Sequence, residues 1–273
     1  MQAITRARKN IIIGAAVVLG LLFMAGAQEA SASHSWGGYH WARTANPLKI
    51  SLGDNVGSAW DSYLQTASTD WSQSLVIDTA IVPTKSNKPR TCRAVAGRVE
   101  VCNALYGSTG WLGIATVWAS GSHITQATVR LNDTYYRTAK YNTPAWKQFV
   151  VCQEIGHTFG LAHQDESFSN ANLGSCMDYT NLPDTNQHPN SHDYAQLESI
   201  YAHLDTSNTT TQQKASAPAA TDTDPSSWGR AARSERPERP GRESVFENTL
   251  QNGDKVFTFV VWADDAGHED HDH

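Results

Sequence analysis

Residues 143–163, TPAWKQFVVCQEIGHTFGLAH, decide the fold of this 273-residue chain. Thr143 followed by Pro144 is typical of the first turn of a helix, because threonine caps exposed N–H groups and proline has none to leave unpaired. Apolar residues fall on both sides of the predicted helix, which indicates a buried, central element. Gly160 can take the left-handed conformation that ends a helix.

The predicted helix brings polar side chains to one point. Gln153 and His157 are four residues apart and project from one face, and after the glycine the chain turns back with His163. Three such donors can hold a metal ion and leave a fourth position for water. Glu154, beside them, is placed to act as general base. The alternative is a buried helix with satisfied polar groups, which leaves Glu154 without the partner that a buried carboxylate needs.

Two segments resemble the metzincin metalloproteases. Residues 153–163, QEIGHTFGLAH, are similar to the Gln-first, gametolysin-like variant of their signature, Q-E-x-x-H-x-x-G-x-x-H. Residues 174–180, GSCMDYT, are similar to the Met-turn that lies under the metal, with Met177 as its methionine. Tyr179 matches the Met-x-Tyr spacing of the astacin-like and serralysin-like relatives.

The resemblance implies a site and a fold. It implies zinc held by Gln153, His157 and His163, with Tyr179 as an auxiliary ligand or oxyanion stabiliser. Asp165 is either a further ligand, a group that orients His163, or a surface carboxylate. The implied fold class is α+β, with a mixed twisted sheet packed on the active-site helix. Residues 124–133 resemble an edge strand that binds extended peptide by strand addition.

The function implied by the resemblance is that of a secreted metalloendopeptidase, which hydrolyses peptide bonds through a metal-activated water. The substrate would be a protein or peptide. Gln153 changes this expectation, because an amide oxygen is a weaker donor than imidazole, so metals other than zinc become conceivable. The alternative is a catalytically impaired metzincin-fold binding module for peptide or cell-surface material.

Four cysteines indicate two disulfides in an exported chain. Their spacing favours Cys92–Cys102 and Cys152–Cys176, and the other pairings remain open. A Cys152–Cys176 bridge would tie the active helix to the Met-turn of the resemblance and fix the floor of the metal site.

The N-terminus reads as a secretory signal peptide over residues 1–32, with a basic start, an apolar run at 11–27 and the small-residue site ASA at 30–32. An uncleaved anchor is the alternative, although the run is at the short limit for a span. We therefore expect a secreted, extracellular protein with no stable membrane insertion after cleavage. The catalytic domain is expected at 33–205 and a flexible linker at 206–227.

Residues 228–273 are expected to form a small β module, an appendage whose hairpin turns at Asn252–Gly253, followed by an acidic tail with histidines. The net charge of −6 gives no support for a nucleic-acid partner, and a monomer is expected. The other histidines of the domain show no ligand spacing to one another; they are His34, His40, His123, His188, His192 and His203.

Overall fold

The computed structural model describes residues 33–84, 88–168, 170–211, 223–232 and 243–263. The predicted signal peptide and the acidic tail lie outside the described residues, as does 212–222 of the predicted linker. Within the described part of the chain, no helix is long and apolar enough to cross a lipid bilayer.

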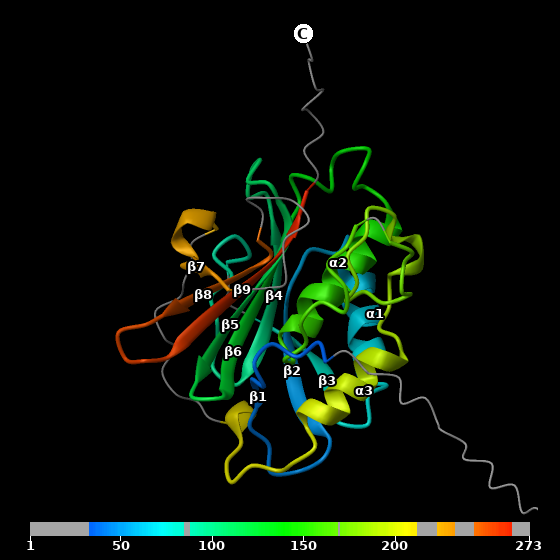
Figure 1. The fold of residues 1–273 in the computed structure, drawn as a ribbon. Helices are drawn as coiled ribbons and strands as arrows, with labels where there is room; N and C mark the ends of the chain where they lie inside the picture. The colour runs from blue at the N-terminus through cyan, green and yellow to red at the C-terminus, as the bar shows by residue number, and fades with distance from the viewer. Residues whose placement is uncertain (1–32, 85–87, 169, 212–222, 233–242, 264–273) are drawn as a thin grey trace, which may run out of the picture. The chain divides into compact units, whose positions relative to one another are not determined.

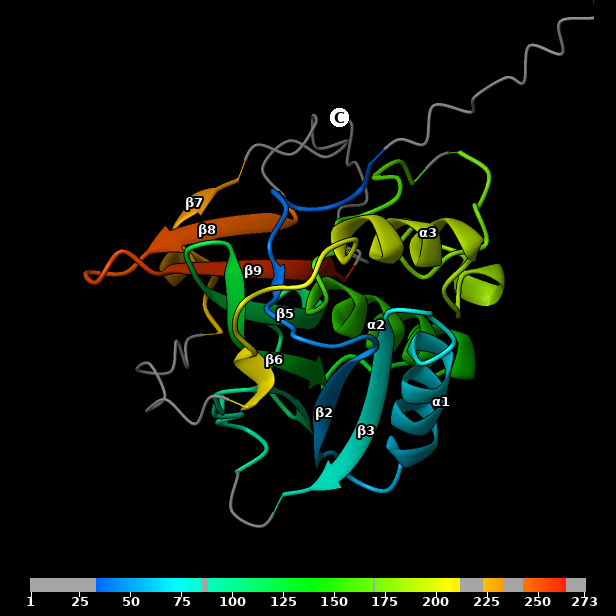
Figure 2. The same ribbon diagram turned by 90° about the horizontal axis from the view of Figure 1, so that it is seen from below.

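A mixed sheet forms one layer, and α-helices cover one of its faces (Figures 1 and 2). The strand order is β3-β2-β4-β6-β5-β9-β8-β7, with β1 paired to β6. Strand β5 is antiparallel to both of its neighbours, whereas β2, β3, β4 and β6 pair in parallel. The strands are β1 (His40–Trp41), β2 (Leu48–Asn55), β3 (Ile77–Pro83), β4 (Arg98–Ala104), β5 (Trp111–Ser120), β6 (His123–Asn132), β7 (Arg230–Ala231), β8 (Val245–Thr249) and β9 (Lys255–Trp262).

The segment at 124–133, expected at a sheet edge, lies in the interior of the sheet. Strand β6 pairs with β4 on one side and with β5 on the other. Almost all of its side chains are buried, as expected for a strand covered on both faces. The strand beyond it, β5, has its second side paired with β9.

Strands β7, β8 and β9 extend this same sheet. Strands β8 and β9 form an antiparallel hairpin whose turn contains Gly253 at a φ of 86°. Strand β9 then pairs with β5 from Trp111 opposite Trp262 to Ala119 opposite Lys255. The boundary at 228 therefore does not separate two sheets in the described structure.

Helix α2 (Pro144–His157) packs on β5 and β6 and lies beside α1 (Asp61–Trp71), which packs on β3. The Thr143 side chain accepts a hydrogen bond from the Trp146 N–H and caps the helix as predicted. Every residue from Phe149 to His157 is buried. The third helix, α3 (Ser191–Ile200), begins with a capping box between Asn190 and Asp193.

The two disulfides have the pairing favoured by the spacing, Cys92–Cys102 and Cys152–Cys176. The second bridge joins α2 to the segment that carries Met177, with the two Cα atoms 6.0 Å apart. Met177 packs directly beneath the helix at Gly156, where any Cβ would collide with its sulfur and with the Trp71 ring. The floor of the candidate site is thus fixed both covalently and by close packing.

Candidate functional site

Two imidazoles meet at the C-terminal end of α2. His157 lies on its last turn, and His163 returns from the loop that follows, so that their Nε2 atoms are 3.0 Å apart. Gly160 makes this return possible with a φ of 102°, and a Cβ there would collide with the Tyr39 carbonyl. The structure thus brings His157 and His163 together.

The hydrogen bonds of the two Nδ1 atoms determine the tautomer of each imidazole ring. His157 Nδ1 lies 2.8 Å from the Leu161 carbonyl, and His163 Nδ1 lies 3.2 Å from a carboxylate oxygen of Glu166. Both partners are acceptors, so each Nδ1 donates and each Nε2 presents a lone pair. Burial, and secondarily the proximity of His163, holds the pKa of His157 well below its ordinary value. Two buried nitrogen lone pairs this close together suit a cation that both nitrogens bind from one side.

Gln153 adds an unsatisfied amide. Its side chain is fully buried, and neither its oxygen nor its nitrogen has a hydrogen-bond partner in the described structure. Leaving such a group unpaired costs about 1–3 kcal/mol. Ligation of the amide oxygen by a cation would remove part of that cost, so the donor set of Gln153, His157 and His163 fits a divalent metal.

Glu154 faces the sheet from the next position on α2. Its carboxylate is fully buried, makes no bond that satisfies hydrogen-bond geometry, and lies where a side chain on Gly113 of β5 would strike it. Burial raises the pKa of Glu154 well above its ordinary value, and the backbone N–H groups of Val261 and Ala115 oppose that rise. Burial thus favours the protonated form of Glu154 relative to a carboxyl group in water.

Tyr179 and Asp165 take different positions. The Tyr179 ring lies against His163, with centroids 4.2 Å apart, while its hydroxyl lies 3.5 Å from the Val260 carbonyl of β9. The Asp165 carboxylate accepts from Ser167 N and Asn170 Nδ2, and so shapes its own loop. Asp165 was one candidate for the group that orients His163. In the structure Glu166, which the sequence did not single out, makes that contact.

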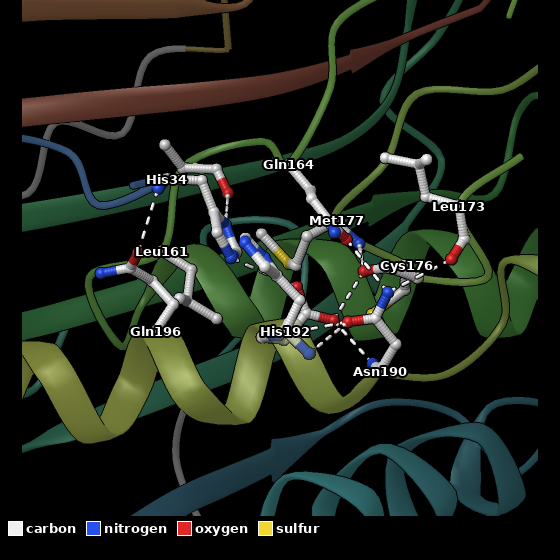
Figure 3. A network of polar contacts seen from close by, with 12 residues as sticks. His34, Leu161, Gln164, Leu173, Cys176, Met177, Asn190, His192 and Gln196 are labelled. Atoms are coloured by element: carbon white, nitrogen blue, oxygen red, sulfur yellow. Dashed lines mark hydrogen bonds and ion pairs between the residues drawn. The ribbon is translucent and has the colours of Figure 1, made fainter. Parts of the chain in front are cut away.

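A polar network holds the Met177 segment against α3 (Figure 3). The Met177 N–H donates to Ser175 Oγ, which in turn donates to the Asp193 carboxylate at 2.6 Å. Asp193 also accepts from Asn190 N, and His34 Nε2 lies 3.5 Å from its second oxygen. This network fixes the floor of the site from the side opposite the sheet.

Strand β9 lies over the site. The Phe259 ring stacks on the His157 imidazole at a centroid distance of 4.3 Å, and Trp36 packs against Phe259 while donating its indole N–H to the His157 carbonyl. A cleft of about 850 Å³ opens beside this cover, near Glu166, and Phe257 is part of its lining. The run Val256–Trp262, apolar apart from Thr258, is the sequence signal for this burial, because an exposed hairpin would show one polar face.

No protein-family model and no curated protein sequence matches this chain. Among solved structures, the chain is similar to high choriolytic enzyme 1, a hatching-enzyme zinc protease from the medaka fish Oryzias latipes. The TM-score is 0.34 and the identity 12%, over 61% of this chain and 96% of that one. It is also similar to myroilysin, with a TM-score of 0.33 and 13% identity over 64% of this chain and 96% of that one.

Proposed function

We propose that this protein is an exported metalloendopeptidase whose metal ion, zinc in the first instance, is held by Gln153, His157 and His163. The observation that carries the proposal is the pair of buried Nε2 atoms of His157 and His163, 3.0 Å apart. On the same helix, the buried side chains of Gln153 and Glu154 have no hydrogen-bond partner in the described structure. Two disulfides suit an oxidising compartment outside the cytoplasm. The substrate would be a protein or peptide.

The chain's own residues would divide the work of hydrolysis. Leu161 and Glu166 orient the two imidazoles through their Nδ1 atoms. Glu154 would accept a proton from the attacking water and donate it to the leaving amine. When bound, the metal supplies Lewis acidity to the water and to the scissile carbonyl. The Tyr179 hydroxyl, already beside a backbone carbonyl, would stabilise the developing oxyanion.

The test combines metal content with peptide cleavage in wild type, Glu154→Gln and Gln153→His. The proposal expects about one metal at this site in wild type, and cleavage that Glu154→Gln abolishes without loss of the metal. Metal-free, inert wild type that gains both properties in Gln153→His would show instead that the amide disables the site.

A second candidate function is a binding module that grips peptide without cleaving it. The weak Gln153 donor and the cover formed by β9 favour it. Under this alternative, Glu154→Gln would leave peptide binding and biological function unchanged.

A further inference from the structure

We propose that β9 is a substrate-like strand, resident in the groove where β5 receives extended peptide, so that the chain's C-terminal strand competes with substrate. That β9 competes with substrate rests on the proposed peptidase function. That β9 occupies the groove can be measured separately, by peptide binding. The occupant is described in the structure, and it is part of this chain.

The first step is the position of β5. Its one side pairs with β6, so without β9 its other side would be an antiparallel edge directly above α2. An open strand edge presents unpaired N–H and C=O groups and captures extended peptides by strand addition. Strand β9 pairs with this edge from Lys255 to Trp262, and the register shifts once, at a bulge between Trp111 and Gly113.

The second step is where one peptide group of β9 lies. The Val260 carbonyl is 3.5 Å from the Tyr179 hydroxyl. The next residue, Val261, is paired with Gly113 of β5, the residue against which the Glu154 carboxylate lies. A scissile bond needs its carbonyl beside the oxyanion stabiliser and its nitrogen beside the group that donates a proton. The Val260–Val261 peptide group therefore lies where a substrate bond would lie.

The third step is side-chain chemistry. Alternate residues Phe257, Phe259 and Val261 join the main core on the α2 side, whereas Val260 joins the small cluster on the opposite face of the sheet. Phe259 fills the space over His157 and against Trp36. The groove therefore fits an extended peptide with aromatic or β-branched side chains at every second position.

The test locks β9 onto β5 in the full mature chain. Thr116 and Thr258 are directly opposite each other, so Thr116→Cys with Thr258→Cys places a removable disulfide between the strands. The matched control, Thr249→Cys with Lys255→Cys, closes the hairpin between β8 and β9 without fixing it to β5. Mass spectrometry verifies that the reductant opens the new bond and leaves the two native bridges intact.

Two readouts are taken in the oxidised and reduced forms. Capture of a labelled synthetic peptide, KVFTFVVW, is measured in the Glu154→Gln background, and cleavage of a peptide library is measured with Glu154 present. We expect reduction of the lock to raise peptide capture and cleavage by about tenfold. The reason is that apparent affinity is the intrinsic affinity multiplied by the fraction of chains in which the groove is open, and the closed lock lowers that fraction. Oxidation of the control pair should change neither.

The outcomes separate the two proposals. Equal peptide capture and equal cleavage with the lock closed and open would overturn the occupancy and leave the peptidase function standing. Peptide capture that follows the lock, with no cleavage in either form, would support the occupancy and reject the peptidase. If the lock does not form, Thr258→Pro unseats the strand instead, and hydrogen exchange must then show faster exchange of β5 amides with increased capture.

Three histidines converge on one carboxylate oxygen in a separate part of the fold. The ring nitrogens Nε2 of His40, His123 and His203 lie 3.4, 3.2 and 3.5 Å from one oxygen, Oδ1 of Asp205. His40 and His203 also face each other, with their Nε2 atoms 3.2 Å apart. The four residues come from β1, the start of β6 and the segment after α3, and their sequence spacing gave no sign of this convergence.

The surroundings orient this cluster. His40 Nδ1 lies 3.0 Å from the Gly38 carbonyl, so its Nε2 carries a lone pair, and the second Asp205 oxygen accepts from Arg43 N at 2.9 Å. Tetrahedral zinc with ligands at about 2.0–2.1 Å separates neighbouring ligand atoms by about 3.3 Å, which the cluster matches. We infer a second cation site for zinc or a similar transition metal, with His40, His203 and Asp205 as ligands and His123 beside them.

Zinc counting tests this site. The mature protein, His203→Ala, and the pair His40→Ala with His203→Ala are each equilibrated with zinc and analysed for bound metal, with circular dichroism as a check on folding. We expect one zinc fewer in the variants and no change in the control His188→Ala, an exposed histidine that contacts Asp70. Unchanged zinc content in the folded double variant would overturn the inference.

Discussion

Phe259 of β9 stacks on the imidazole of His157, with ring centroids 4.3 Å apart and ring planes at 12°. The C-terminal strand therefore contacts a candidate ligand face to face, from a position about a hundred residues later in the chain. This contact couples the stability of β9 to the exposure of the site.

Phe259→Ala removes this contact and leaves a cavity beside α2. We expect a loss of about 3 kcal/mol or more in the free energy of unfolding, because Phe259 is fully buried. We also expect faster modification of His157 by diethyl pyrocarbonate, followed by mass spectrometry. Phe246→Ala, on the other face of the sheet, is the control and should leave His157 protected.

Glu154→Gln should act on catalysis and on stability in opposite directions. Cleavage should fall by about 10²-fold or more, the usual contribution of a general base. The folded-state pKa is raised, so the carboxylic acid stabilises the fold at low pH and this contribution is lost as pH rises. The metal-free variant should therefore have a higher Tm than wild type at neutral pH, and an equal or lower Tm would contradict the buried position of the carboxylate.

Gln153→His should tighten metal binding, because imidazole is the better donor. We expect at least about a tenfold gain in zinc affinity, or 1.4 kcal/mol, measured by competition with a chromogenic chelator. Gln148→His, on the same helix and also buried, is the control and should show no gain. Equal zinc affinity in wild type and Gln153→His would argue that position 153 does not face the metal.

Removal of the Cys152–Cys176 bridge should lower stability more than removal of Cys92–Cys102. The bridges span 24 and 10 residues, so their chain-entropy contributions are about 3.4 and 2.7 kcal/mol. Only Cys152→Ser with Cys176→Ser should also weaken zinc binding, since only that bridge anchors the Met177 segment. Urea denaturation and zinc titration of both double variants provide the comparison.

The pH dependence of stability should show two opposed contributions near α3. Burial lowers the pKa of His34 to about 4, so the unfolded chain binds the proton first and stability falls as pH drops from about 6.5 to 4. Burial raises the pKa of Asp193 to about 6, so its contribution is present at low pH and is lost as pH rises through 6.

Urea denaturation between pH 4 and 7 separates them. His34→Gln should lose less stability on acidification than wild type, by up to roughly 3 kcal/mol. Asp193→Asn should change the slope in the opposite direction. Parallel curves for all three proteins would contradict these assignments.

The sequence predicted the parts of the fold that depend on local signals. Thr143 and Pro144 mark the start of α2, and Gly160 marks the return of the chain. Gln153 and His157 share one face of the helix by their spacing of four residues. The favoured cysteine pairing is also present in the structure. These features depend on neighbours within a few turns of chain, which a sequence displays directly.

Features that depend on contacts between residues far apart in the sequence could not be predicted from local sequence patterns. Strand order decides that β6 is interior and that β9 covers β5, and hydrophobic periodicity does not encode order. The convergence of His40, His123 and His203 on Asp205 likewise requires three separate elements to be placed first. Glu166 was missed because only the turn after His163 decides which of two adjacent carboxylates reaches the ring.

The position of β9 at the end of the strand sequence also bears on the order in which the sheet can form during synthesis. Chains are synthesised from the N-terminus, and β9 is the last strand of the described sheet to appear. Until Trp262 has emerged, β5 has no partner on its second side, although α2 and the Met177 segment are already present. Under the proposed occupancy, a nascent chain whose last strand has not emerged would present an uncovered β5 edge, and the pairing of β9 would then cover it.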